Sequence, residues 1–233
     1  MIEIDKKNLP KHIAITMDGN GRWAKAKGKN RVFGHKNGVT AVRETVESAV
    51  ENNIEFLTLY AFSTENWLRP KLEVNSLMNL LVSSIINETK TLMKNDIKLM
   101  AIGDINKIPK SAKNKLDSVI EKTKKNSKMS LILAISYSGR WEILNAVKKI
   151  IKNNINVNEI NEHLFKQYLD TKNVPDPELV IRTSGEHRIS NFLLWQIAYS
   201  ELYFTKILWP DFRKKDFINA IVEYQKRDRR FGK

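Results

Sequence analysis

Short apolar segments alternate with longer amphipathic segments along most of the chain, and this alternation is the feature that most restricts the fold. The short segments are apolar at consecutive positions, as in Ile13-Ala14-Ile15, rather than at every second position. Strands of this composition are buried on both faces and belong to parallel sheets covered by helices. Strands are predicted at residues 12–17, 55–62, 97–103, 130–137, 179–183 and 205–209.

The segments between these strands carry apolar residues at helical spacing. The longest stripe includes Val74, Leu77, Leu81 and Ile85, which would share one face. The sequence has no repeats, and the polar stretch 152–178 is interpreted as a surface excursion, so one domain is expected over residues 1–233. Helices are predicted over residues 38–52, 73–94, 111–126, 140–154, 159–168, 190–199 and 214–229, in right-handed crossovers.

The composition limits the classes of partner and compartment. A net charge of +14 favours nucleic acid, a phosphorylated substrate or an anionic membrane surface, and charge alone does not choose among them. The absence of cysteine excludes disulfides and thiolate metal sites. The opening residues lack the apolar core of a secretion signal, and no stretch approaches the ~20 apolar residues of a membrane span. A cytoplasmic protein is expected.

Arginine, glycine, serine and asparagine are concentrated just after the predicted strands. Residues 18–23 follow the first strand, 63–69 the second, 137–141 the fourth and 182–190 the fifth. Since parallel strands end at one edge of their sheet, these four segments would meet there. Arginines grip phosphate, and a lone carboxylate among cations, Asp18, would be ionised and able to hold Mg²⁺. A site for phosphate and metal is therefore predicted.

Each segment also has a simpler interpretation when it is taken alone. Asp18-Gly19 fits an ordinary turn, and the run from Ser63 to Asn66 fits a helix cap. A functional site is favoured over these simpler interpretations because all four segments follow the ends of predicted strands. No GxxxxGK[ST] is present, and Ala24 replaces the last glycine of GxGxxG, so the two common nucleotide-binding signatures are excluded.

Four long motifs closely resemble those of the cis-prenyltransferases, the family of undecaprenyl diphosphate synthases. They are HIAITMDGNGRWAKAKGKNRVFGHKNG from residue 12, LTLYAFSTENWLRP from residue 57, AISYSGRWEI from residue 134 and LVIRTSGEHRISNFLLWQIAYSELYF from residue 179. The resemblance extends from about residue 10 to residue 230. It implies an α/β fold, with a mostly parallel six-stranded sheet flanked by helices, an apolar tunnel and a homodimer.

The resemblance also implies the reaction and the cofactor. A Mg²⁺-dependent transferase of this family extends farnesyl diphosphate by sequential cis condensation with isopentenyl diphosphate. The expected product is a long polyprenyl diphosphate, undecaprenyl diphosphate, the precursor of the cell-wall carrier lipid. Trans-prenyltransferases differ in being all-helical and in carrying DDxxD, which is absent here. Transient contact with a membrane surface during product release is compatible with this assignment.

The matched positions imply a set of site residues. Asp18 would bind Mg²⁺ and assist departure of the allylic diphosphate, and Glu201 matches a second metal carboxylate. Asn66 matches the position assigned to proton removal, although an amide is a poor base and is better suited to positioning. The other matched substrate contacts are Gly19, Asn20, Gly21, Arg22, Trp23, Arg31, His35, Ser63, Thr64, Glu65, Trp67, Arg69 and Ile189, with Arg182, Arg188 and Ser190 for isopentenyl diphosphate.

Two alternative functions predict different sequence features. A nucleic-acid-binding protein would fit the charge and the tail KRDRRFGK, but its strands would interleave basic and aromatic residues, so no nucleic-acid partner is expected. A silent partner subunit would have lost Asp18 or the pair Arg182 and Arg188. The ending Arg230-Phe231-Gly232 resembles an Arg-x-Gly ending that acts across the dimer, or it is a basic tail.

Overall fold

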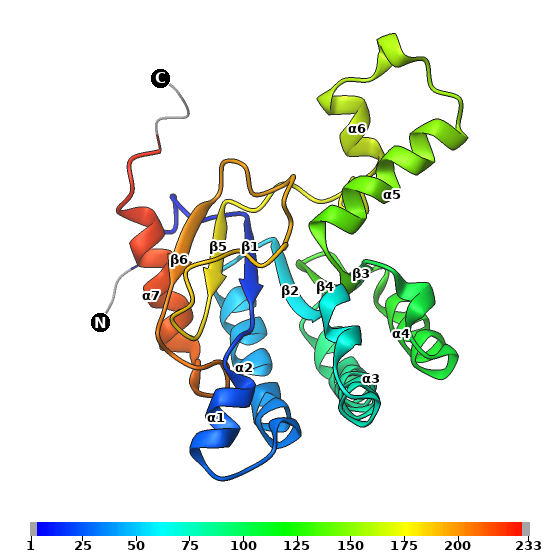
Figure 1. The fold of residues 1–233 in the computed structure, drawn as a ribbon. Coiled ribbons are helices and arrows are strands. Elements are labelled where there is room, and N and C mark those ends of the chain that lie inside the picture. The colour runs from blue at the N-terminus through cyan, green and yellow to red at the C-terminus, as the bar shows by residue number, and fades with distance from the viewer. Residues whose placement is uncertain (1–3, 230–233) are drawn as a thin grey trace.

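A computed structural model describes residues 4–229 and shows a six-stranded sheet with the order β3-β4-β2-β1-β5-β6 (Figure 1). Every pair of neighbouring strands is parallel. The predicted parallel sheet and its six strands are therefore confirmed, with one strand displaced. The strands are β1 His12–Thr16, β2 Phe56–Ser63, β3 Ile97–Ile102, β4 Met129–Tyr137, β5 Leu179–Arg182 and β6 Glu201–Phe204.

Helices connect the strands and cover the sheet. Between β2 and α3 lies a short 3-10 helix, Thr64–Leu68. In Figure 1, α5 and α6 project away from the sheet, while α1 and the first turns of α2 lie beyond the tips of the strands. The helices are α1 Asn20–Ala26, α2 Arg31–Glu51, α3 Lys71–Lys94, α4 Lys110–Thr123, α5 Gly139–Lys152, α6 Glu162–Tyr168 and α7 Lys214–Gln225.

The two faces of the sheet are buried in different ways. On one face, Ile13 and Ile15 belong to a large core with apolar residues of α2, α3, α4 and α7. On the other face, Ala14 packs in a smaller core that includes Phe192 and Leu193 from the segment after β5. Alternate residues of β1 thus enter different cores, because side chains alternate across a strand. All five residues of β1 are buried, which fits the unbroken apolar run in the sequence.

Two predicted elements are wrong. The last strand is β6, Glu201–Phe204, and not residues 205–209, because Trp209 owes its burial to α2, where its indole N–H donates to the Gly38 carbonyl at 3.1 Å. Residues 190–199 form turns and not a helix. Ser190, Asn191 and Leu193 have positive φ angles, and the Asn191 carbonyl accepts the Gly139 N–H at 2.7 Å. Tertiary contacts therefore override the local helical pattern there.

Within residues 4–229, no helix is both long enough and apolar enough to cross a bilayer. The terminal Arg230 and Gly232, which were considered as residues acting across a dimer, lie outside the described residues.

Candidate active site

Asp18 lies just past the end of β1, where four segments that are distant in sequence converge. One carboxylate oxygen accepts the Gly19 N–H at 2.7 Å, and the other accepts Nη2 of Arg182 at 2.9 Å. Burial alone would raise the pKa of this carboxyl, but hydrogen bonds from Arg182, from the Gly19 N–H and from Ser184 outweigh it, and the pKa is lowered. Asp18 is therefore an anion at neutral pH, as predicted from its cationic surroundings.

Gly19 allows the chain to turn from β1 into α1. Its φ is +108°, which is costly for any residue with a Cβ, and a Cβ there would lie 3.0 Å from the Leu208 Cα. The Trp209 N–H donates to the Asp18 carbonyl at 2.9 Å, so the segment after β6 closes over the same turn. The predicted glycine turn is thus fixed by close packing against residues 208–209.

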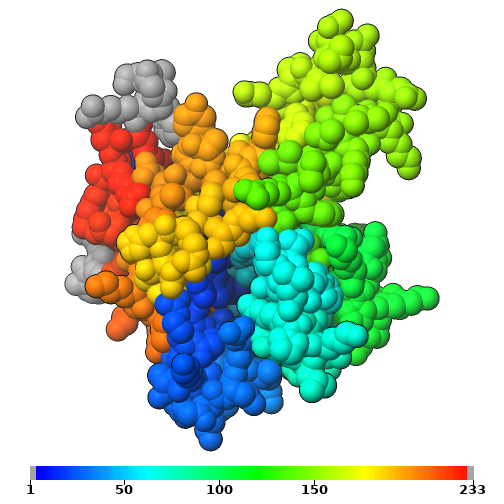
Figure 2. Space-filling view, in the orientation of Figure 1, coloured from blue at the N-terminus to red at the C-terminus, as the bar shows by residue number. Residues whose placement is uncertain are grey.

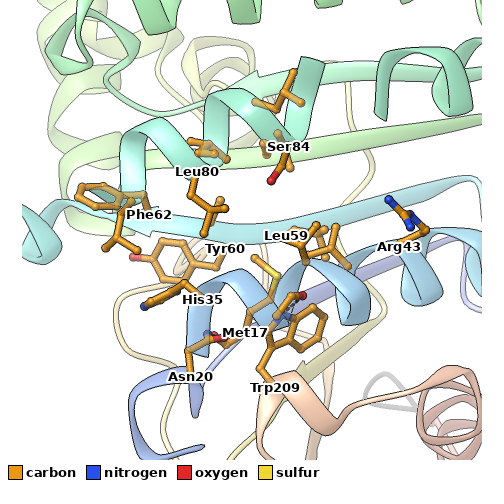
Figure 3. Close-up of a pocket in the computed structure, with 18 of the residues that line it drawn as sticks. Met17, Asn20, His35, Arg43, Leu59, Tyr60, Phe62, Leu80, Ser84 and Trp209 are labelled. Atoms are coloured by element: carbon orange, nitrogen blue, oxygen red, sulfur yellow. Dashed lines mark hydrogen bonds between the residues drawn. The ribbon is translucent and has the colours of Figure 1, made fainter. Parts of the chain in front are cut away.

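A cavity of about 400 Å³ opens beside Asp18 and extends between α2, α3 and the sheet. In Figure 3, His35 and Arg43 of α2 face Leu80 and Ser84 of α3 across this space, with β2 behind them. Its deeper walls are mostly apolar, and its volume falls within the ~300–1,000 Å³ of small-molecule sites. The predicted site residues that line it are Asp18, Gly19, Asn20, Gly21, Arg22, Arg31, His35, Asn66 and Arg69.

The end of this cavity nearest Asp18 is strongly charged. Arg31 of α2 and Arg69 both pair with Oε1 of Glu73, at 3.3 and 3.2 Å, and so link the starts of α2 and α3. Burial lowers the pKa of His35 to about 4, and the positive charges of Arg69 and Arg31 act in the same direction. His35 is therefore neutral at pH 7, with one ring nitrogen able to donate a hydrogen bond and the other able to accept one.

A second cavity of about 730 Å³ shares Asp18 with the first. Figure 2 shows the surface hollowed where the blue, cyan and yellow-orange segments meet, which are the segments that line the two cavities. Asp18 and Asn66 line both cavities, so a group bound in one lies close to a group bound in the other. The predicted site residues that line the second cavity are Asp18, Ser63, Glu65, Asn66, Arg69, Arg182, Ile189 and Ser190.

Arg182 lines the second cavity and forms an ion pair with Asp18. Its side chain is only 5% exposed, and Nη1 donates to the Arg188 carbonyl at 2.6 Å and to Oγ of Ser190 at 2.7 Å. Its Nε is buried without a partner. A buried guanidinium with an unsatisfied donor is suited to binding an oxyanion.

Asn66 completes a capping box with Ser63, the N-cap residue of the 3-10 helix after β2. Its Oδ1 accepts the Ser63 N–H at 3.1 Å, and Oγ of Ser63 accepts the Asn66 N–H in return. The side-chain oxygen of Asn66 is therefore engaged by the backbone, which favours a role in positioning over one in deprotonation.

Some predicted site residues lie apart from both cavities. Trp23 donates to Asp211 at 2.8 Å and stacks on Phe33. Trp67 donates to Ser136 at 2.9 Å within the partly buried core. Glu201 begins β6, level with Ile13 in the register and so at the end of the sheet opposite Asp18, and it pairs with Arg227. The full set outside the two linings is Trp23, Thr64, Trp67, Arg188 and Glu201.

Several residues that line the site had no role predicted from the sequence. Tyr60 lines both cavities and stacks on Phe192 with ring centroids 4.4 Å apart. Its position inside an apolar strand gave no signal of this. Arg140 and Asn191 line the second cavity. Arg140 belongs to the segment 137–141, where the sequence predicted the site, so its position was a usable signal, whereas Asn191 lies just beyond the predicted segment 182–190.

The residues around Asp18 fit a magnesium ion better than an all-protein metal cage. Among residues 4–229 there is no group of three or more acidic, histidine or cysteine side chains able to hold a metal. Mg²⁺ commonly binds through one or two carboxylates together with substrate phosphates and water. An ionised carboxylate placed between two cavities suits that mode of binding.

Comparisons with known proteins agree with this geometry. A family model described as putative undecaprenyl diphosphate synthase matches residues 16–232. The ditrans,polycis-undecaprenyl-diphosphate synthase of Haemophilus influenzae, named as farnesyl-diphosphate specific, is 51% identical over 100% of this chain and 99% of that protein. The isoprenyl transferase of Clostridium tetani is 50% identical over 99% of this chain and 92% of that protein.

Solved structures are similar over nearly the whole chain. Lavandulyl diphosphate synthase from Lavandula x intermedia, in complex with dimethylallyl diphosphate, has a TM-score of 0.94 and 35% identity, covering 97% of this chain and 100% of that chain. A probable undecaprenyl diphosphate synthase from Campylobacter jejuni has a TM-score of 0.82 and 38% identity, with the same coverage.

Proposed function

Because the chain belongs to the undecaprenyl diphosphate synthase family of prenyltransferases, we propose that it extends farnesyl diphosphate by sequential cis condensation with isopentenyl diphosphate. The proposed product is undecaprenyl diphosphate. The observation that carries the proposal is the pair of cavities that meet at Asp18, one with an apolar interior and one lined by charged as well as apolar residues. A two-substrate condensation needs such a pair, with the reacting carbons close to the shared wall.

The first cavity is proposed to hold the allylic substrate, with its diphosphate at the charged end. Arg22, Arg31 and Arg69 supply cationic donors there, and neutral His35 supplies a further hydrogen-bonding group. As the allylic carbon–oxygen bond breaks, negative charge grows on the departing diphosphate, and fixed donors stabilise that charge more strongly than the ground state. When bound, Mg²⁺ would neutralise part of the same charge, held by Asp18 and the substrate phosphates.

The apolar interior of the first cavity is proposed to be the tunnel for the growing chain. Transfer of a prenyl chain from water to an apolar environment is favourable by ~0.8 kcal/mol per buried CH₂, so each added isoprene unit is stabilised by contact with an apolar wall. Leu77, Leu81 and Ile85 of α3 and Leu59 of β2 supply such a wall. Deeper still, Arg43 pairs with Glu88 between α2 and α3, which gives the cavity a polar boundary.

The second cavity is proposed to hold isopentenyl diphosphate. Arg182 and Ser190 would bind its diphosphate, and its terminal alkene carbon would face the allylic carbon near Asp18. A new carbon–carbon bond then forms as diphosphate leaves, and a proton is lost from the isopentenyl unit. Asn66, which lines both cavities, would position the reacting groups. Arg188 would act through its backbone carbonyl, which holds Arg182.

A homodimer is proposed to be the working form, in contact with membranes at times. The outer face of α5 exposes Leu144, Val147 and Ile151, which suits an interface between two copies.

Leu68 and Leu72, beside the cavity residue Arg69, are 89% and 84% exposed and could touch a bilayer during product release. Binding to anionic vesicles that does not weaken in a Leu68→Ser, Leu72→Ser variant would argue against that contact.

The function is tested by incubating the purified protein with farnesyl diphosphate, labelled isopentenyl diphosphate and Mg²⁺, and by sizing the products chromatographically. A ladder ending near eleven isoprene units is expected. No product with Mg²⁺ present, or products with only trans double bonds by NMR, would overturn the proposal. Omission of Mg²⁺ should abolish elongation while the fold persists, since residues 4–229 contain no group of three or more acidic, histidine or cysteine side chains able to hold a structural metal.

A further inference from the structure

The second cavity carries three arginines, and their charges are not balanced in the same way. Arg69 pairs with Glu73 at 3.2 Å, and Arg182 pairs with Asp18 at 2.9 Å. Arg140, in the first turn of α5, forms no side-chain hydrogen bond or ion pair with any residue in the described part of the chain. Its guanidinium is thus the uncompensated positive charge of the cavity lining.

The carboxylates of the same cavity are already engaged. Asp18 is held by Arg182, and Oε1 of Glu65 accepts Nδ2 of Asn191 at 3.0 Å. Neither carboxylate therefore serves as a partner for Arg140. A polar cavity with one guanidinium in excess attracts an anion, and a guanidinium binds phosphate oxygens through a planar fork.

Asn191 fixes the position from which Arg140 acts. Its Oδ1 accepts the Arg140 N–H at 2.9 Å, and its carbonyl accepts the Gly139 N–H at 2.7 Å. Through Glu65 the same side chain reaches the 3-10 helix after β2. The backbone of Arg140 is thereby tied to both segments that form the cavity with it, which distinguishes this arginine from an untethered surface cation.

We propose that Arg140 is a further diphosphate-binding residue, specific for isopentenyl diphosphate in the second cavity. The inference rests on the proposed function, because it names the substrate through that reaction. Arg140 lines only the second cavity, whereas Arg69 lines both. Removal of the Arg140 guanidinium therefore weakens binding of isopentenyl diphosphate and leaves binding of farnesyl diphosphate unchanged.

The test measures steady-state kinetics of Arg140→Gln with each substrate varied in turn. A charge-assisted hydrogen bond lost from a binding site corresponds to a rise of about tenfold or more in KM for isopentenyl diphosphate. KM for farnesyl diphosphate should change by less than about twofold, since the first cavity is untouched. Arg140→Lys, which keeps the charge and loses the planar fork, should fall between the wild type and the glutamine variant.

Lys148→Gln is the matched control, because it removes an exposed charge from the same helix at a position that lines neither cavity. It should leave both KM values unchanged. Equal KM for isopentenyl diphosphate in the wild type and in Arg140→Gln would overturn the inference, as would equal shifts in Arg140→Gln and Lys148→Gln. Failure of the wild type to elongate would instead overturn the proposed function. Calorimetric titration of each variant with isopentenyl diphosphate alone gives the same comparison without turnover.

Discussion

At the scale of single residues, the charge of Asp18 is the feature on which the proposed chemistry depends most. Asp18→Asn keeps the shape of the side chain and removes its charge. The charge of Asp18 contributes most in the transition state, when the diphosphate departs. Its removal should therefore lower kcat by about 10²–10³-fold, with a smaller change in KM. Steady-state rates and a thermal melt of the same sample measure this. A folded Asp18→Asn protein with nearly normal kcat would contradict the assignment.

The surroundings of Asp18 also show why its partners were hard to predict. The sequence placed Asp18 and Arg182 at strand ends, and the parallel sheet brings them together as expected. Thr183 was not singled out, yet its Oγ1 accepts the Asp18 N–H at 2.9 Å and donates to the Asp18 carbonyl at 2.6 Å. Thr183 belongs to the segment 182–190 that was predicted to lie at the site, but the sequence does not show which residue it contacts, because the contact is made across 165 residues of sequence.

At the scale of elements, a glycine at position 38 lets α2 pack closely against Asn20 and Trp209. A Cβ on Gly38 would lie 2.6 Å from Oδ1 of Asn20 and 2.9 Å from the Trp209 ring. Gly→Ala in a helix interior normally stabilises by about 0.5–1 kcal/mol. Here overpacking should reverse the sign and cost about 1–3 kcal/mol. Denaturant unfolding of Gly38→Ala would measure this.

The control for that variant is Thr40→Ala, at an exposed position of the same helix. It gains helix propensity without a clash and should be neutral or slightly stabilising. If Gly38→Ala were as stable as Thr40→Ala, α2 would have room that the structure does not show.

The wall formed by α3 should set the length of the product. Leu81 and Ile85 line the first cavity, and Ile85 is buried against the sheet. Replacement of either by tryptophan should shorten the products while farnesyl diphosphate is still accepted, because the charged end of the cavity is unchanged. Chromatographic sizing of the products measures this, and a thermal melt tests for overpacking.

Ile86→Trp is the matched control for the α3 variants, since Ile86 is 43% exposed on the same helix and lines neither cavity. Its products should match those of the wild type. Unchanged product lengths in well-folded Leu81→Trp and Ile85→Trp proteins would mean that α3 is not the wall of the tunnel.

Elements also differ in how far the sequence predicted them. The first five strands and α3 follow from apolar pattern alone, and each lies within a few residues of its predicted bounds. Residues 190–199 have a helical pattern but fold into turns, because hydrogen bonds of Asn191 to Gly139, Arg140 and Glu65 hold them. The start of α2 at Arg31 was also missed, since its first turns bury glycines against α1 and carry no apolar stripe.

At the scale of the whole molecule, the buried His12 and the partly buried His35 should make the fold sensitive to acid. Burial lowers the pKa of both His12 and His35 from 6.5 to about 4. Between these values the unfolded chain binds protons that the native protein does not, so stability falls as pH falls below 6.5. The free energy of unfolding should drop by roughly 2 kcal/mol per histidine between pH 7.5 and pH 5.

Comparison of the wild type with His12→Gln isolates this effect. His12 is held between the Pro175 carbonyl and Oγ1 of Thr58, at 2.6 and 2.7 Å, so the variant should be less stable at pH 7.5. Its stability should nevertheless vary less with pH, because one titrating group is gone. Urea unfolding at both pH values measures this, and parallel pH profiles for the two proteins would show that His12 does not contribute.

The assembly of the molecule should depend on the outer face of α5. Leu144, Val147 and Ile151 recur at helical spacing, and Leu144 and Ile151 are 61% and 68% exposed on a helix that projects from the body (Figure 1). Large apolar residues grouped in this way mark an interaction surface more often than scattered ones do. The wild type should sediment as a dimer at micromolar concentration, and Leu144→Asp with Ile151→Asp should sediment as a monomer, because a buried interface does not tolerate unpaired carboxylates. Ile86→Asp, which places the same charge on α3, should stay dimeric. A double variant that remained a dimer at every concentration would mean that the two copies meet through another surface.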